Sequence, residues 1–206
     1  TKDGSGILTL SSQNTYSGGT TVNNGTLDLV GQGIIDGVLT VDGSSSVVKL
    51  SGTSHNAVSG ISSLTVQNGG TFTDNTPGTF VQSMPSVTIH NGGTLTSEAG
   101  SDGNSGFGNF LFTNALNVTG TGLATINANR IGFNYNQTVT VADSVAGSGT
   151  DLLISSSIRN ERVGNITKNG GGTLELTATD STDTSGWIVN AGTLEIGGAG
   201  SLGSGS

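Results

Sequence analysis

The sequence predicts an all-β protein, a right-handed parallel β-helix (a solenoid) of about nine turns. Three observations predict this fold. Glycine contributes 36 of the 206 residues and proline only 2, apolar and polar residues alternate in many short stretches, and one Gly-Thr-apolar step recurs along the chain. Short strands joined by tight turns produce such a composition, and a recurring unit too short to be a domain has to stack on its neighbours.

The composition narrows the class of protein further. Only 4% of the residues are aromatic and 10% charged, and 14 acidic against 6 basic residues give a net charge of -8. A nucleic-acid binder needs a basic surface, and an anionic membrane repels an acidic chain. We therefore expect no nucleic acid as a partner and no direct membrane insertion of this segment. Cysteine is absent, which excludes disulfides and thiolate chemistry.

The recurring step is Asn-Gly-Gly-Thr, or a close variant, followed by an apolar residue. Its copies lie at 23–29, 68–73, 91–96, 169–176 and 190–196. Thr71 and Thr94 are 23 residues apart, and Thr173 and Thr193 are 20 apart. A period of this length cannot bury its own apolar face, so each unit is one turn of a stack. At about 4.8 Å per turn, the stack is about 40 to 45 Å long.

Pairs of alternating stretches fill the gaps between these copies. They lie at 39–41 and 48–50, 116–118 and 124–126, and 139–141 and 152–154. Period-2 alternation is typical of strands with one buried face, and no segment sustains a 3.6-residue apolar pattern. We expect almost no helix, and the right-handed sense follows from the usual crossover between parallel strands.

The stretch VTIHNGGTLT at 87–96 illustrates one turn. We expect Val87, Ile89 and Leu95 to point inward, with a corner at residues 91–93. Glycine reaches positive φ without a clash and asparagine tolerates it, so these residues suit the corner, where stacked asparagines also form a hydrogen-bonded ladder. The predicted turn residues are Asn24, Gly25, Asn68, Gly69, Gly70, Asn91, Gly92, Gly93, Asn169, Gly170 and Gly171.

A longer duplication carries a family resemblance. Residues 2–29 match 168–196 with a one-residue insertion, and the shared pattern begins with Lys-x-Gly-x-Gly and continues to Asn-x-Gly-Thr-Leu. This pattern resembles the autotransporter-associated β-strand repeat, also called the passenger-associated transport repeat, of type V autotransporters of Gram-negative bacteria. The resemblance implies an extracellular passenger at the bacterial cell surface, anchored or released, whose repeats assist secretion and folding. It also implies the passenger's own C-terminal outer-membrane barrel as a partner.

Because the chain begins without Met, we expect residues 1–206 to be a single solenoid fragment of a larger passenger. Loops near 97–114 and 155–165 are longer than the repeat requires. We expect a stalk that acts in adhesion or self-association, with a host-surface or extracellular-matrix molecule, or the same protein on another cell, as partner. The alternative is a β-helical polysaccharide lyase or hydrolase, which needs two or three carboxylates in one groove. The acidic residues are too scattered for this, so we expect no enzyme.

The two lengthened loops hold the candidate ligand contacts, because loops that interrupt a solenoid often carry function. These candidates are Phe107, Asn109, Arg159 and Arg162. In FGNFLF the alternating Phe110 and Phe112 fit either a core strand or a ligand contact. The arginines, with Asp151 nearby in the sequence, fit either an acidic sugar or protein carboxylate, or a solvated ion-pair loop.

Other residue types give weaker signals. Phe133 and Tyr135 fit either a stacking pair for sugar rings or structural packing. His55 and His90 lack convergent ligand partners, and the stretch at 101–108 resembles a calcium loop but lacks its closing glutamate. We therefore expect no metal, no cofactor and no catalytic residue.

Overall fold

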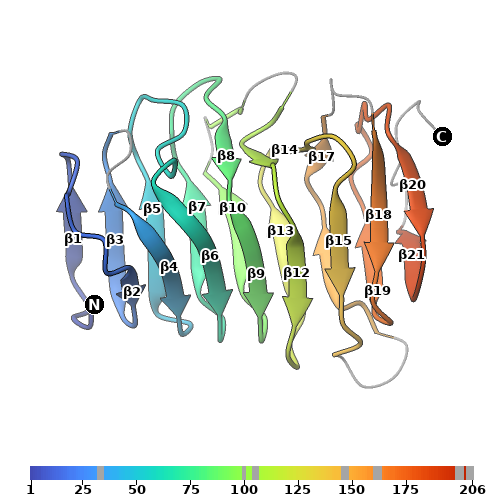
Figure 1. Ribbon diagram of the computed structural model, residues 1–206, viewed down its shortest axis with the longest axis horizontal. Helices are drawn as coiled ribbons and strands as arrows, with labels where there is room; N and C mark the ends of the chain where they lie inside the picture. Colours follow the sequence, from blue (N-terminus) through green and yellow to red (C-terminus); the bar gives the residue numbers. More distant parts are fainter. Residues whose placement is uncertain are drawn as a thin grey trace.

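The computed structural model describes residues 1–31, 35–98, 101–103, 107–144, 149–159, 164–197 and 202. Within these residues every regular element is a β-strand, and the strands form three sheets in which all pairings are parallel. Figure 1 shows the strands following one another along the long axis, from the N-terminal end to the C-terminal end. The described residues contain no helix of the length and apolarity that a membrane span needs.

The strands divide among the three sheets as follows. The nine-stranded sheet contains β1 (Ile7–Leu10), β3 (Gly25–Leu29), β5 (Ser46–Leu50), β7 (Thr71–Asp74), β10 (Thr94–Ser97), β13 (Ala124–Asn127), β16 (Leu152–Ile154), β19 (Thr173–Leu176) and β21 (Thr193–Ile196). The eight-stranded sheet contains β2 (Thr20–Val22), β4 (Gly37–Asp42), β6 (Ile61–Gln67), β9 (Ser86–His90), β12 (Leu116–Thr119), β15 (Thr138–Val141), β18 (Asn165–Asn169) and β20 (Gly186–Val189). The four-stranded sheet contains β8 (Gln82–Met84), β11 (Phe110–Phe112), β14 (Arg130–Phe133) and β17 (Ser157–Ile158).

Each turn of the chain runs from one strand of the nine-stranded sheet to the next. The nine strands therefore mark the beginning and end of about eight turns. Thr94 lies opposite Thr71 and Thr193 opposite Thr173, which confirms the spacings of 23 and 20 residues. Thr125 lies opposite Thr94, 31 residues later, so that turn is longer. The predicted all-β parallel solenoid is confirmed, and its right-handed sense stays a prediction.

One apolar core runs through the stack. Val87, Ile89 and Leu95 are fully buried within it, as the alternation predicts. Parallel strands pair equivalent residues of successive turns, so each inward position forms a column along the axis: Val87, for example, lies opposite Leu64 on one side and Leu116 on the other. Burial of these columns, at about 25 cal/mol per Å² of apolar surface, is the main force that holds the turns together.

The four-stranded sheet was not predicted from the sequence, and its phenylalanines extend the core. Phe110 packs on Phe72 with ring centroids 5.8 Å apart, and Phe112 stacks on Phe133 at 5.3 Å. Phe133 in turn makes a T-shaped contact with Trp187, with ring centroids 6.3 Å apart. Phe110, Phe112 and Phe133 have no exposed surface, so packing explains all three. The idea that Phe133 stacks on a sugar ring is therefore wrong.

The corners between the eight-stranded and nine-stranded sheets are built as predicted. Asn68 and Asn91 have positive φ angles of 53° and 49°. The amide of Asn91 donates to Asn68 Oδ1 at 3.0 Å, and the amide of Asn68 donates to Asp42 Oδ1 at 2.7 Å. The asparagine ladder is thus confirmed between two turns, and Asp42 continues it into a third. Predicted turn residues with positive φ are Gly25, Asn68, Gly69, Asn91, Gly92 and Gly170, whereas Asn169 is the last residue of β18.

Candidate interaction surface

The outer face of the eight-stranded sheet carries a continuous column of hydroxyl and amide side chains. Strand register places equivalent residues of successive turns beside one another, and we call this column the polar ladder. Its members are Thr21, Thr40, Thr65, Thr88, Asn117, Thr140 and Asn169. All are half-buried, because each side chain packs against its neighbours above and below. Asn190 of the next turn extends the column, and its amide donates to Asn169 Oδ1 at 2.9 Å.

This face is nearly free of charge. In the described strands of the eight-stranded sheet the charged residues are Asp42 and Lys168, and Lys168 is fully buried. Asp42 lies at the corner, where it accepts a hydrogen bond from Gln67 Nε2 at 2.9 Å. His90 is the register partner of Gln67 in the following turn, and its Nδ1 lies 3.0 Å from the hydroxyl of Thr119. The surface therefore offers many neutral donors and acceptors in a regular array.

The lengthened turn at 97–114 is anchored by a buried polar cluster. Asn109 Nδ2 donates to Asp74 Oδ2 and to the carbonyl of Ser101, both at 3.0 Å. Thr76 donates to the other carboxylate oxygen, Asp74 Oδ1, from its hydroxyl at 2.7 Å. Burial raises the pKa of Asp74, and the hydrogen bonds from Asn109, Thr76 and Ser101 oppose that shift. Asn109 has no exposed surface, which contradicts the expectation that it contacts a ligand.

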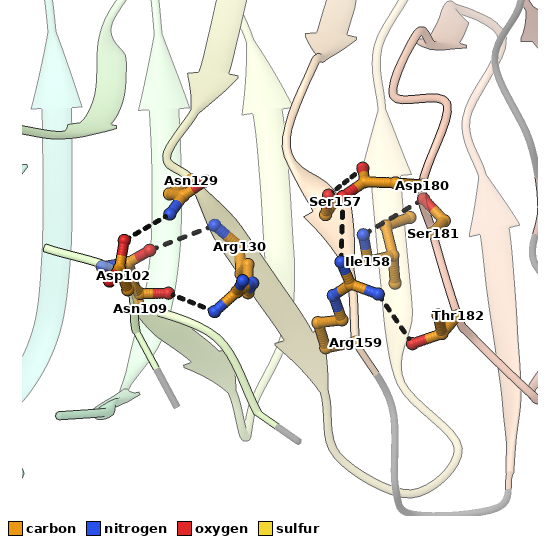
Figure 2. Close-up of polar contacts among 10 residues, drawn as sticks. All are labelled: Asp102, Asn109, Asn129, Arg130, Ser157, Ile158, Arg159, Asp180, Ser181 and Thr182. Atoms are coloured by element: carbon orange, nitrogen blue, oxygen red, sulfur yellow. Dashed lines mark hydrogen bonds and ion pairs between the residues drawn. The ribbon is translucent and has the colours of Figure 1, made fainter. Parts of the chain in front are cut away.

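The neighbouring arginine is also bound to this loop, as Figure 2 shows. Arg130 Nη1 donates to the carbonyl of Asp102 at 3.0 Å, and its backbone N–H donates to Asn109 Oδ1 at 3.1 Å. Asn129 reaches the Asp102 carboxylate at 3.3 Å. Phe107 lies within this loop and is half-buried. Residues 104–106 of the calcium-like stretch at 101–108 lie outside the described residues.

Arg159 follows β17 and is tied to the next turn (Figure 2). Its Nη2 forms an ion pair with Asp180 Oδ2 at 2.9 Å, and its Nη1 donates to Thr182 Oγ1 at 3.0 Å. A hydrogen bond from Ser157 and, less strongly, the charge of Arg159 lower the pKa of Asp180. Arg159 thus forms an ion-pair loop, one of the two interpretations left open by the sequence. Arg162 lies outside the described residues.

Asp151 is not part of the Arg159 ion pair. Its carboxylate accepts hydrogen bonds from the backbone N–H groups of Thr173 at 2.7 Å and Ser144 at 2.8 Å, so it supports the corner before β19. The sequence suggested a role beside Arg159 because the two residues are only eight positions apart. In the solenoid, strands β16 and β17 separate them and place them at different corners.

The cationic side chains of the described residues all make contacts between turns. The lysines of the two duplicated segments, Lys2 and Lys168, bond carbonyls of the following turn. Lys49 on β5 pairs with Glu98, which follows β10, at 3.4 Å, while Arg130 and Arg159 make the contacts given above. In an acidic chain these few positive charges therefore stabilise the stack, and the outer ladder stays neutral.

The described residues contain no group of three or more His, Asp or Glu side chains placed to hold a metal ion. His55 lies at the surface, where its Nδ1 accepts the backbone N–H of Val81 at 3.0 Å. A shallow groove of about 350 Å³ lies beside the β8–β9 corner, and Ser59, Ser62 and Ser83 are among its lining residues. The whole lining is uncharged and so supplies no carboxylate pair for glycoside chemistry.

These features define the class of protein as a parallel β-solenoid repeat protein with a neutral, ladder-bearing face. Residues 1–29 and 166–196 match the family model of the passenger-associated transport repeat. The chain thus carries two copies of this repeat, which is characteristic of autotransporter passenger domains. No curated protein and no solved structure matches the chain. The repeat family implies a secreted or surface location.

Proposed function

We propose that this chain is a stalk segment of a surface-displayed or released passenger that acts in adhesion or self-association, and that it is not an enzyme. The polar ladder is the single observation that carries this proposal. It presents neutral hydrogen-bonding groups at every turn of the eight-stranded sheet. The partner is a host-surface or extracellular-matrix molecule, or the same face of a second copy on another cell.

The physical argument rests on number. One hydrogen bond to a hydroxyl or amide group of the ladder adds only about 0.5–1.5 kcal/mol, because each group gives up bonds to water. A rigid column presents its groups together, so the ordering cost is met once for the whole face, and binding of several stalks per cell multiplies the effect. Contacts of this neutral kind are weakly screened, so we expect them to persist at high ionic strength.

A paired set of variants tests the role of this face. Thr65→Lys with Thr88→Lys places two like charges side by side on the polar ladder, because these residues are register partners. The matched control is Thr71→Lys with Thr94→Lys, which puts the same charges on partners in the nine-stranded sheet. Chains tethered to non-adherent cells are scored for clumping and for binding to host cells and matrix proteins.

We expect the ladder variant to reduce clumping or binding at least tenfold and the control to leave it within twofold. Both pairs add the same charge and the same repulsion within a sheet, so a loss of fold affects them equally. Equal effects of the two variants on clumping and binding would show that the polar ladder is not the adhesive surface. A wild-type chain that neither clumps cells nor binds any surface would rule out the adhesive function.

A further inference from the structure

Lys168 occupies an inward position of β18, between Val139 and Val189 of the neighbouring strands. It is fully buried, although lysine is almost never fully buried unless its ammonium is paired. The Nζ atom donates to the carbonyl of Gly170 at 3.0 Å and to the carbonyl of Ala191 at 2.9 Å. Gly170 lies at the corner of its own turn, and Ala191 lies at the corner of the next turn.

Lys2, in the other copy of the repeat, makes the same two contacts. Its Nζ donates to the carbonyl of Gly4 and to that of Asn24, the latter at 2.9 Å. The first acceptor is two residues away in both copies, and the second is 22 residues away here and 23 residues away from Lys168. Lys2 also lies beside Val22 of the following turn, as Lys168 lies beside Val189. The two copies of the repeat thus place their lysine in the same set of contacts.

In both copies a glycine of the following turn comes directly after the second acceptor, where a larger residue does not fit. Gly25 comes directly after the acceptor Asn24 and has a φ of +74°; a Cβ there would lie 2.4 Å from the Gly4 carbonyl oxygen and 2.7 Å from Lys2 Nζ. Gly192 follows the other acceptor and has a φ of +70°, and its Cβ would lie 2.6 Å from the Gly170 carbonyl oxygen. The Lys-x-Gly and Asn-x-Gly-Thr parts of the repeat therefore form one contact.

The ammonium of Lys168 also offsets the negative charge of a buried carboxylate. Burial lowers the pKa of Lys168, and the charge of the buried Asp151 opposes that shift. Asp151 in turn receives the backbone N–H of Thr173, the first residue of β19. The carboxylate, the ammonium and the two carbonyls therefore compensate one another at a corner where two turns meet, and no exposed partner is required for this.

We propose that the lysine of each repeat is a clamp that fixes the corner of the following turn onto the corner of its own and sets their register. Turns of similar sequence can pair almost equally well when one strand slips by two residues, because the apolar face is then preserved. An ammonium with one carbonyl partner in each turn fits one alignment only. The clamp belongs to the repeat itself and does not depend on the adhesive function proposed above.

Hydrogen exchange of three equivalent amides tests the clamp. The backbone N–H groups of Thr26, Thr94 and Thr193 each donate to a glycine carbonyl of the preceding turn, namely Gly6, Gly70 and Gly172. Thr26 and Thr193 each come two residues after a carbonyl that a repeat lysine binds, and Thr94 does not. Lys168→Met and Lys2→Met keep the length and apolar stem of the side chain and remove its donors. The matched control is Lys49→Met, which removes a partly exposed cation that pairs with Glu98 and lies outside both repeats.

We expect Lys168→Met to speed exchange at Thr193 at least tenfold and Lys2→Met to do the same at Thr26, while Thr94 changes less than twofold in both. Lys49→Met should leave Thr26 and Thr193 unchanged. If Lys168→Met fails to fold, Lys2→Met decides alone, because it affects only the first turn. Unchanged exchange at Thr26 in Lys2→Met, or an equal acceleration at Thr94, would overturn the proposal. Neither result bears on adhesion, which is measured separately.

Discussion

The two adjacent glycines at the corner after β9, Gly92 and Gly93, are required for different physical reasons. Gly92 has a φ of +77°, and a Cβ there would meet nothing closer than 3.5 Å. The next residue, Gly93, has an ordinary φ, but its Cβ would lie 2.3 Å from the carbonyl oxygen of Val66. The first position is thus restricted by backbone conformation and the second by contact with the preceding turn.

We therefore predict that Gly93→Ala destabilises the protein more than Gly92→Ala does. The left-handed conformation of a non-glycine residue costs about 1–2 kcal/mol, which is the expected loss at position 92. At position 93 the backbone of Val66 must move, and we expect a loss of about 3 kcal/mol or more. Urea unfolding of both variants measures the difference, and the reverse order would show that contact between turns is not the limiting factor.

The carboxyl group of Asp74 makes stability depend on pH. Its pKa in the folded protein is raised above 3.8, mainly by burial. Between 3.8 and the raised value the folded state binds more protons than the unfolded state, so stability falls as the pH rises through that window. Asp74→Asn removes this titration.

We accordingly predict the pH dependence of one difference, the unfolding free energy of the wild type minus that of Asp74→Asn. This difference is largest below pH 3.8 and falls as the pH rises. Denaturant titrations of both proteins from pH 3 to pH 7 measure it. Because the other carboxyl groups are common to both chains, their contribution cancels. A difference that stays constant, or grows with pH, would contradict a raised pKa at this site.

At the level of elements, the four-stranded sheet depends on its aromatic side chains. Phe112 on β11 stacks on Phe133 of β14 with an angle of 23° between the rings. We predict that Phe112→Ala lowers the unfolding free energy by about 3–5 kcal/mol, the usual result of removing a buried phenylalanine. Tyr135→Ala is the control, because Tyr135 is 55% exposed, and it should cost less than about 1 kcal/mol. Comparable losses in chemical denaturation would argue against the aromatic stack.

Local pattern was enough to predict most strands and corners. Val87 and Ile89 alternate with polar residues, and Asn91 precedes two glycines, so both the inward positions and the corner can be read from a few adjacent residues. The contacts that were missed lie far apart in the sequence. Asn109 reaches Asp74 across 35 residues, and a polar residue in a lengthened loop therefore resembled a ligand contact.

The buried lysine was missed for a different reason. Alternation was read from apolar residues alone, so it gave no expectation for Lys168, which lies inside. A usable signal was present, since Lys2 and Lys168 each precede the same x-Gly-x-Gly sequence. The outer polar ladder was predictable in kind, but its members became known only through strand register, which depends on the length of every turn between them.

For the molecule as a whole, a stack of turns whose contacts are mainly between neighbours should tolerate the loss of one complete turn. Thr26 lies opposite Val47, so deleting residues 26–46 joins two equivalent points and brings β1 beside β5 and β2 beside β6. We predict a folded, shorter solenoid whose urea m-value is about one tenth lower, in proportion to the 21 residues removed. Circular dichroism and urea titration measure this, and an unfolded product would refute nearest-neighbour stacking.

The polar ladder also has a geometric consequence for any lateral contact. Its groups repeat at the spacing of the strands, about 4.8 Å, with little to distinguish one turn from the next. Two such faces laid against each other therefore have many equivalent alignments, one for each step of a single turn. Stalks that meet at unequal heights can pair over whatever length they share, and the strength of the contact then grows with overlap and not with exact position.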